Sequence, residues 1–176
     1  MTRRIYLAGP EVFLPDPAEA AARMKAICTE LGLEGLFPQD AQLSPMIGEP
    51  PARFAARIRA ANIALIQAAD GVIANVGPFR GPSADDGTAF EIGYAVALAR
   101  PVFCWSGESG TLLDRSRRRL DLSWDGAAWR DPEGLEVEEF GLPVNLMLVD
   151  PARPVVYESF AAAARACAAH FSAGGA

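Results

Sequence analysis

The chain has 176 residues, of which 51% are hydrophobic and 22% charged, a length and composition that indicate one globular domain with its own core. With 16 Lys and Arg against 22 Asp and Glu the formal charge is −6, and no sustained basic stripe occurs, so we expect neither a nucleic acid polymer nor a membrane as partner. The three cysteines form no CxxC pair, and no apolar run is long enough for a signal peptide or a membrane span. We therefore expect a reduced, cytoplasmic protein.

Short apolar runs alternate with helical patterns through the first half of the chain. The pattern predicts strands at residues 5–8, 36–37 and 71–76, with helices over 16–31 and after Pro50-Pro51. A turn rich in Gly, Pro and Asp then covers residues 77–87.

The second half continues the alternation and then loses it. A helix carrying Phe90 and Leu98 ends before Pro101, and a strand follows at 102–105. Residues 106–139 read as an irregular excursion with a short helix near 112–120, and a last helix spans about 157–171. We predict one α/β domain over residues 1–176, with a parallel sheet covered by helices on both faces. Ligands of such sheets bind beyond the carboxyl ends of the strands.

The segment from Asp85 to Gly93 is the strongest candidate for chemistry. A Gly-containing turn leads into a helix start, where the helix dipole would keep the Glu91 carboxylate ionised and able to attack an electrophilic carbon. The same residues also match a capping box, Thr88 to Glu91, in which Glu91 would only bond the first helical amide. The spacing by itself leaves both interpretations open.

Carboxylates must carry most of the chemistry, because the single histidine, His170, lies in an alanine-rich C-terminal helix. Arg80, in a rigid Pro- and Gly-rich loop, could hold a ribose or a phosphate, or be a solvated surface arginine. The sequence has neither a GxGxxG nor a GxxxxGK[ST] motif, which disfavours dinucleotide and Walker-type nucleotide binding.

Several segments, taken in order, resemble the nucleoside 2-deoxyribosyltransferase family. The matching pieces are Ile5-Tyr6-Leu7-Ala8-Gly9-Pro10 with Phe13, Phe37-Pro38 to Gln42, Asp70-Gly71-Val72, Pro78 to Pro82, Asp85 to Gly93, and Asn145-Leu146-Met147. Each piece alone is weak, whereas the ordered set covers nearly the whole chain.

The resemblance implies a flavodoxin-like, Rossmann-type fold and an enzyme that cleaves the N-glycosidic bond of a 2′-deoxynucleoside. Glu91 matches the nucleophile, which forms a covalent deoxyribosyl intermediate before the sugar passes to another nucleobase. Asp85 and Asp70 match acids near the sugar and base, one of which moves the proton of the base. Tyr6 matches the tyrosine that orients the nucleophile.

The resemblance also assigns the substrate contacts. Gln42 matches the glutamine that reads the nucleobase edge, and Gly9, Phe13 and Arg80 fall in the matched substrate-binding segments. The match also covers Asn145 and Met147, which family members contribute across a subunit interface, so the implied protein is a homo-oligomer. Its partners would be small nucleosides and nucleobases, with no metal and no cofactor.

Two alternatives stay open at this point. A hydrolase of the same superfamily would use the same nucleophile with water, and would act on nucleosides or nucleoside 5′-monophosphates, with Arg80 and Ser83 as candidate phosphate donors. A non-catalytic nucleotide-sensing module would use Glu91 and Asp85 only to hold ligand hydroxyls.

Overall fold

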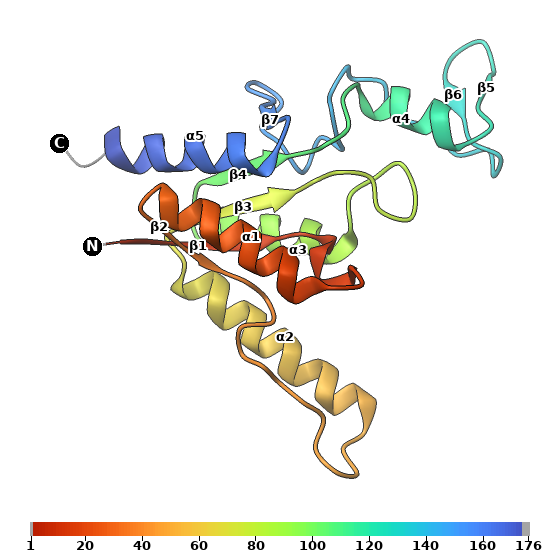
Figure 1. Cartoon of the computed structure of the whole chain (residues 1–176). Coiled ribbons are helices and arrows are strands. Elements are labelled where there is room, and N and C mark those ends of the chain that lie inside the picture. Colours follow the sequence, from red (N-terminus) through yellow and green to blue (C-terminus); the bar gives the residue numbers. More distant parts are fainter. Residues whose placement is uncertain (1, 174–176) are drawn as a thin grey trace.

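The chain folds around a parallel sheet with helices on both of its faces (Figure 1). The computed structural model describes residues 2–173, and within that range five strands pair in the order β2-β1-β3-β4-β7. The strands are β1 (Arg3–Ala8), β2 (Leu33–Leu36), β3 (Gly71–Asn75), β4 (Val102–Trp105) and β7 (Val156–Tyr157). The principal helices are α1 (Pro17–Glu30), α2 (Pro51–Ala68), α3 (Asp86–Ala97), α4 (Leu112–Arg119) and α5 (Phe160–Ala173). The predicted α/β fold class is confirmed.

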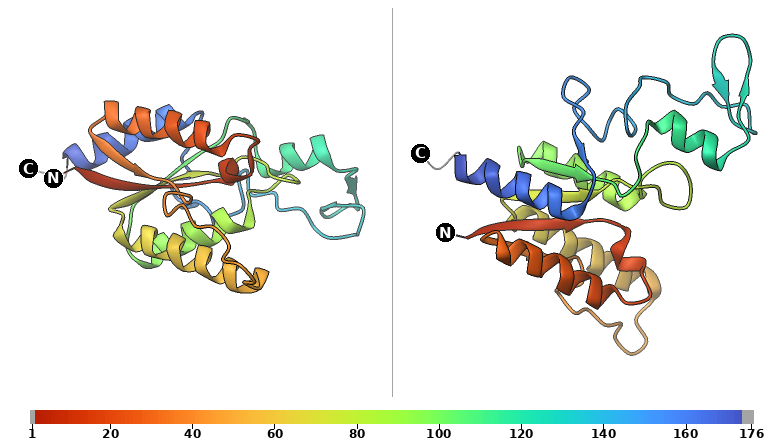
Figure 2. Two further views of the ribbon diagram at one scale, coloured as in Figure 1. Left: turned by 60° about the horizontal axis from the view of Figure 1, so that its bottom comes forward. Right: turned by 45° about the horizontal axis from the view of Figure 1, so that its top comes forward.

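Alternating side chains of the strands build two hydrophobic layers, one on each face of the sheet. Val72 and Ala74 of β3 pack with residues of α2 and α3, whereas Ile73 packs with residues of α1 and α5. The views in Figure 2 show the same pairing of helices on the two faces. Strands buried on both faces explain why the sequence showed continuous apolar runs instead of alternation.

Carboxylates and prolines fix where the helices begin. The Asp16 side chain accepts a hydrogen bond from the backbone N–H of Glu19, 2.8 Å away, and so caps α1. Pro51 occupies the first turn of α2, where its missing N–H costs nothing. Thr111 and Asp114 form a reciprocal capping box at the start of α4.

Residues 106–139 form an arm that projects from the sheet (Figures 1 and 2). It contains α4, as predicted, and a short antiparallel hairpin that was not predicted, β5 (Ser123–Trp124) and β6 (Trp129–Arg130). The rings of Trp124 and Trp129 lie 5.6 Å apart across the hairpin. The arm adds no strand to the main sheet, which is why the periodicity of the sequence fades there.

The chain returns to the sheet through β7, which pairs with β4 through Cys104 and Trp105. The sequence analysis placed Tyr157 at the start of the last helix, but this residue belongs to β7 and the helix begins at Phe160. No helix among residues 2–173 is long and apolar enough to cross a membrane.

Candidate active site

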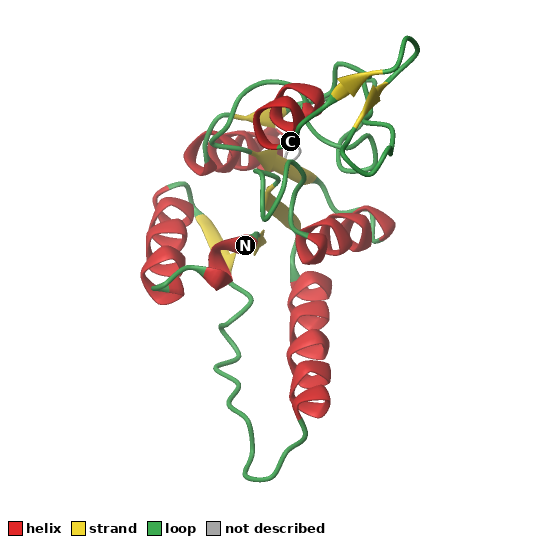
Figure 3. Ribbon diagram, turned by 90° about the vertical axis from the view of Figure 1, so that its right-hand side faces the viewer, coloured by secondary structure: helices red, strands yellow, loops and turns green. Residues whose placement is uncertain are grey.

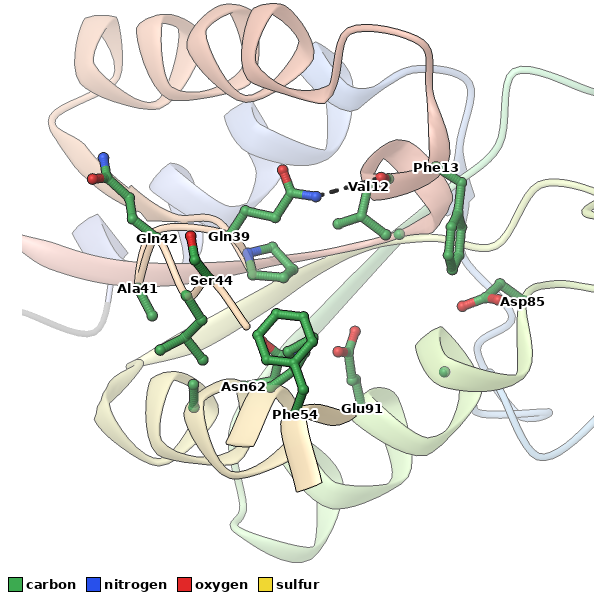
Figure 4. A pocket seen from close by; sticks show the side chains of 16 residues that line it. Val12, Phe13, Gln39, Ala41, Gln42, Ser44, Phe54, Asn62, Asp85 and Glu91 are labelled. Atoms are coloured by element: carbon green, nitrogen blue, oxygen red, sulfur yellow. Dashed lines mark hydrogen bonds between the residues drawn. The ribbon is translucent and has the colours of Figure 1, made fainter. Parts of the chain in front are cut away.

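A cavity of about 700 Å³ opens beyond the carboxyl end of β1 (Figure 4). Three parts of the chain surround it: the turn after β1, the segment after β2, and the facing sides of α2 and α3. The lining side chains used below are Gly9, Phe13, Gln42, Ser44, Phe54, Ile58, Asn62, Asp85 and Glu91. The position agrees with the rule that parallel sheets bind ligands at the carboxyl ends of their strands.

Tyr6 and Glu91 meet at one side of this cavity. The Tyr6 hydroxyl donates a hydrogen bond to Glu91 Oε1 over 2.6 Å. Tyr6 lies in β1 and is 0% exposed, so packing on every side fixes its ring. Glu91 lies in the second turn of α3, next to Ile92, which packs in the core. Two rigid elements thus hold the two groups together, and the free carboxylate edge faces the cavity (Figure 4).

Burial sets the electrostatics of this pair. Removal from water raises the pKa of Glu91 to about 7, while the Tyr6 hydrogen bond opposes the rise and the nearby charge of Asp85 adds to it. Burial, reinforced by the adjacent Glu91, also raises the pKa of Tyr6, which keeps its proton and remains a donor. The sequence analysis expected the helix dipole to keep Glu91 ionised. Burial raises its pKa instead, so at neutral pH the Glu91 carboxylate is only partly ionised.

Asp85, not Thr88, caps α3. Its Oδ2 accepts hydrogen bonds from the backbone N–H of Thr88 at 2.9 Å and from the Thr88 hydroxyl at 3.1 Å. The capping-box interpretation of Glu91 is therefore wrong, because the helix begins earlier than that interpretation required. Both Asp85 and Glu91 line the cavity.

Asp70 lies outside the cavity, and its predicted place near the sugar and base is corrected. It precedes β3 and therefore lies at the amino end of that strand, whereas the cavity lies at the carboxyl ends. Its carboxylate accepts hydrogen bonds from the backbone N–H of Arg4 at 2.8 Å and from the Arg3 guanidinium at 3.3 Å. These bonds, led by the one from Arg4, lower the pKa of Asp70.

An aromatic side chain after β1 lines one side of the cavity. The Phe13 ring lines the cavity and stacks on Phe79 with a centroid separation of 5.4 Å. The Arg80 guanidinium lies 5.5 Å from the Phe13 ring and 4.7 Å from the Phe79 ring, within cation–π range of both, and Arg80 does not line the cavity. A Cβ at Gly9 would displace the Glu11 carboxylate and press against Asn75 Cβ at 3.0 Å.

Residues 5–147 of the chain match the family described as nucleoside 2-deoxyribosyltransferase. The chain belongs to this family. Among solved structures, a 2-desoxiribosyltransferase from Leishmania mexicana superposes with a TM-score of 0.76 at 36% identity, covering 96% of this chain and 98% of the other. A 2-deoxyribosyltransferase from Bacillus psychrosaccharolyticus gives a TM-score of 0.50 at 25% identity, over 62% of this chain and 78% of that one.

A further relative is an uncharacterized protein, C191.05c, of Schizosaccharomyces pombe. It is 30% identical over 155 residues, which are 81% of this chain and 74% of the relative. The family and the fold together support a nucleoside deoxyribosyltransferase-like activity.

The sequence analysis missed one polar residue of the cavity in this nucleoside 2-deoxyribosyltransferase family member. Asn62 of α2 lines it, and the side-chain oxygen is buried without a hydrogen-bond partner among the described residues. An unpaired buried amide oxygen is costly unless a ligand or water supplies a donor. The available signal was an amide placed four residues after Ile58 and three before Leu65, on the apolar side of this helix.

Asn145 and Met147 are not brought to the cavity of their own chain. Asn145 donates a hydrogen bond to Glu138 over 2.7 Å and accepts one from the backbone N–H of Met147 over 3.0 Å. The Met147 side chain is 78% exposed. That these two residues serve a neighbouring subunit stays a prediction.

Proposed function

We propose that the chain is a nucleoside 2-deoxyribosyltransferase that works through a covalent intermediate on Glu91. The observation that carries the proposal is the Tyr6–Glu91 pair at the wall of a cavity large enough for a nucleoside. A buried carboxylate with a pKa of about 7 is ionised in roughly half of the molecules at neutral pH. It is also poorly solvated, which favours attack on carbon.

The proposed reaction has two displacements at the sugar C1′. In the first, a Glu91 oxygen bonds to C1′ as the C1′–N bond breaks, and the departing base keeps the bonding electrons and receives a proton. In the second, a nitrogen of another base bonds to C1′, the ester bond to Glu91 breaks, and the incoming base loses a proton. Two inversions at C1′ retain the configuration of the sugar.

We assign the proton transfer to Asp85, the other carboxyl group lining the cavity. Its proximity to Glu91 supports this role, because the Asp85 charge helps to raise the pKa of Glu91. Tyr6 stabilises the ionised nucleophile and releases it as the ester forms. Asp70 has no part in the proposal, because it lies at the other end of the sheet.

The remaining lining residues suit a nucleobase. Phe54 and Ile58 offer apolar surface to its faces, and the side chains of Gln42, Ser44 and Asn62 offer hydrogen bonds to its edges. Asn145 and Met147 complete the site of a second subunit in this proposal, which makes the active form a homo-oligomer.

Exchange between bases tests the proposal. The purified protein is given a deoxynucleoside and a different free base, and chromatography follows the new deoxynucleoside. We expect a new nucleoside from the wild type and none from Glu91→Ala, with both proteins folded. Release of base and free sugar without exchange would instead identify a hydrolase, and binding without turnover would identify a sensing module.

A further inference from the structure

One wall of the cavity is a long loop with little structure of its own. Residues 37–50 contain neither strand nor helix, and they run beside α2 away from the sheet (Figure 3). Ala41 to Ser44 of this loop line the cavity opposite Phe54 and Ile58 of α2. The tip of the loop, at Ile47, is fully exposed. Something must therefore hold the loop against the helix.

Arg57 of α2 makes that connection through Glu49 and Ser44. Arg57 Nη1 donates to Glu49 Oε2 over 2.8 Å and to the backbone oxygen of Ser44 over 3.3 Å. The same Glu49 oxygen accepts from the backbone N–H of Met46 at 3.0 Å. One guanidinium thus links the helix to both ends of residues 44–49, and Ser44 is itself part of the cavity wall.

The burial of Glu49 distinguishes this ion pair. Its side chain is 1% exposed, and its second oxygen has no partner among the described residues. In the other ion pairs of residues 2–173, both side chains are more than a quarter exposed. A buried carboxylate that loses its cation keeps an uncompensated charge, so it would move into water and take the loop with it. Exposed ion pairs have no such consequence.

The position of this loop determines what it touches during the reaction. A nucleophile attacks C1′ from the side opposite to the leaving base, so the base lies across the cavity from Glu91. Ser44 lies there, and Gln42 lies on the same side with its amide turned away from Glu91 (Figure 4). The loop therefore contacts the base, whereas Glu91, Tyr6 and Asp85 come from other elements.

We propose that Arg57 and Glu49 are positioning residues that hold residues 41–44, the base-binding wall, in place and so set the ratio of sugar transfer to hydrolysis. The proposal rests on the proposed function. Once the sugar is esterified to Glu91, either a base nitrogen or a water oxygen can bond to C1′ as the ester bond breaks, each losing a proton. A base needs the wall for its binding, whereas water does not. Release of the wall lowers the rate of transfer and leaves hydrolysis running.

The expected size of the effect depends on the fraction of molecules in which the wall stays in place. If loss of the ion pair leaves the wall in place for about one tenth of the time, the apparent affinity for the acceptor base falls about tenfold. At an acceptor concentration well below saturation, the ratio of transfer to hydrolysis then falls by the same factor of about ten.

The test compares Arg57→Gln with Arg53→Gln. Arg53 lies one turn earlier on α2, is exposed, and its side chain makes no hydrogen bond or ion pair with any residue in 2–173, so this control removes the same charge without touching the loop. One assay records new nucleoside and free deoxyribose from a fixed donor over a range of acceptor concentrations. Thermal unfolding of each protein is measured alongside.

We expect Arg57→Gln to raise the KM for the acceptor about tenfold, and to shift product from nucleoside to free sugar by a similar factor. Arg53→Gln should match the wild type. Glu49→Gln should fall between them, because an amide oxygen can still accept the bonds from Arg57 and Met46. It also keeps the proposal testable if Arg57→Gln unfolds.

A wild-type ratio of new nucleoside to free deoxyribose in both Arg57→Gln and Glu49→Gln would overturn the proposal. So would an equal loss of transfer and hydrolysis together with a lower melting temperature, which would indicate a general structural role. Absence of exchange in the wild type would instead contradict the proposed function itself.

Discussion

The hydrogen bond between Tyr6 and Glu91 offers a direct test of how the pKa of Glu91, the proposed nucleophile, is set. Tyr6→Phe keeps the ring that packs in the core and removes only the hydroxyl 2.6 Å from Glu91 Oε1. This bond opposes the effect of burial on the pKa of Glu91, so its loss raises that pKa above the value of about 7 in the wild type. Fewer molecules then carry an ionised nucleophile at neutral pH.

The size of the change follows from the bond that is lost. A hydrogen bond to a charged group contributes about 1.5–3 kcal/mol. At 1.36 kcal/mol per pH unit, the acid limb of the rate profile moves upward by roughly one to two units. Since about half of Glu91 is ionised at pH 7 in the wild type, the variant should lose about 5- to 50-fold of its rate there. By about pH 9 the variant should regain at least about half of its maximal rate.

The assay is kcat/KM for base exchange measured from pH 5 to 9.5, because this parameter reports ionisation in the free enzyme. Thermal unfolding at each pH confirms that the variant is folded. An acid limb that stays in place would refute the assignment of Glu91 as the titrating group. A rate reduced by the same factor at every pH would show that Tyr6 acts by some route other than the ionisation of Glu91.

Three further variants replace the carboxylates Glu91, Asp85 and Asp70 by amides. Because the pKa of Glu91 lies at about 7 in the folded chain and at 4.5 without burial, its ionisation costs the folded state up to about 3 kcal/mol as pH rises from 4.5 past 7. Glu91→Gln should therefore abolish exchange yet unfold at a higher temperature than the wild type at pH 8, with no such gain at pH 4.5. Asp85→Asn keeps a cap for α3 but removes the charge that helps to raise the pKa of Glu91. The acid limb of the rate profile should therefore move to lower pH, while base release slows. An acid limb at the wild-type pH would show that the Asp85 charge does not affect the ionisation of Glu91. Asp70→Asn removes an ion pair at the far end of β3, and its exchange rate should stay within about twofold of the wild type; a large loss would return Asp70 to the mechanism.

The sequence predicted strands β1, β3 and β4, the helices and the region of the site, because these depend on local periodicity. It placed the second strand at 36–37 instead of Leu33–Leu36 and missed the edge strand β7. Strands buried on both faces and helices with one apolar side produce patterns that a single sequence displays. The match of Tyr6 and Glu91 to a family pattern likewise selected two residues that the structure brings together. These features needed no knowledge of which loops approach one another.

The errors arose where tertiary contacts decide the outcome. Asp70 precedes a strand, and the direction of a parallel strand places such a residue at the edge opposite to the ligand. The helix α3 begins at Asp86 because Asp85 bonds Thr88, whereas the sequence pattern indicated a cap at Thr88. Nothing local distinguishes Glu49, whose buried side chain is paired with Arg57 eight residues later.

The buried position of Tyr6 ties the ionisation of Glu91 to the core. Its hydroxyl belongs to a central strand, and the ring packs with Ile66, Val72 and Ile92 in one continuous layer. A substitution in that layer would shift the hydroxyl relative to Glu91 without touching any residue of the cavity wall. Related proteins can therefore differ in the pKa of this carboxylate through changes among interior aliphatic residues. The residues beneath the cavity floor are where such changes should be sought first.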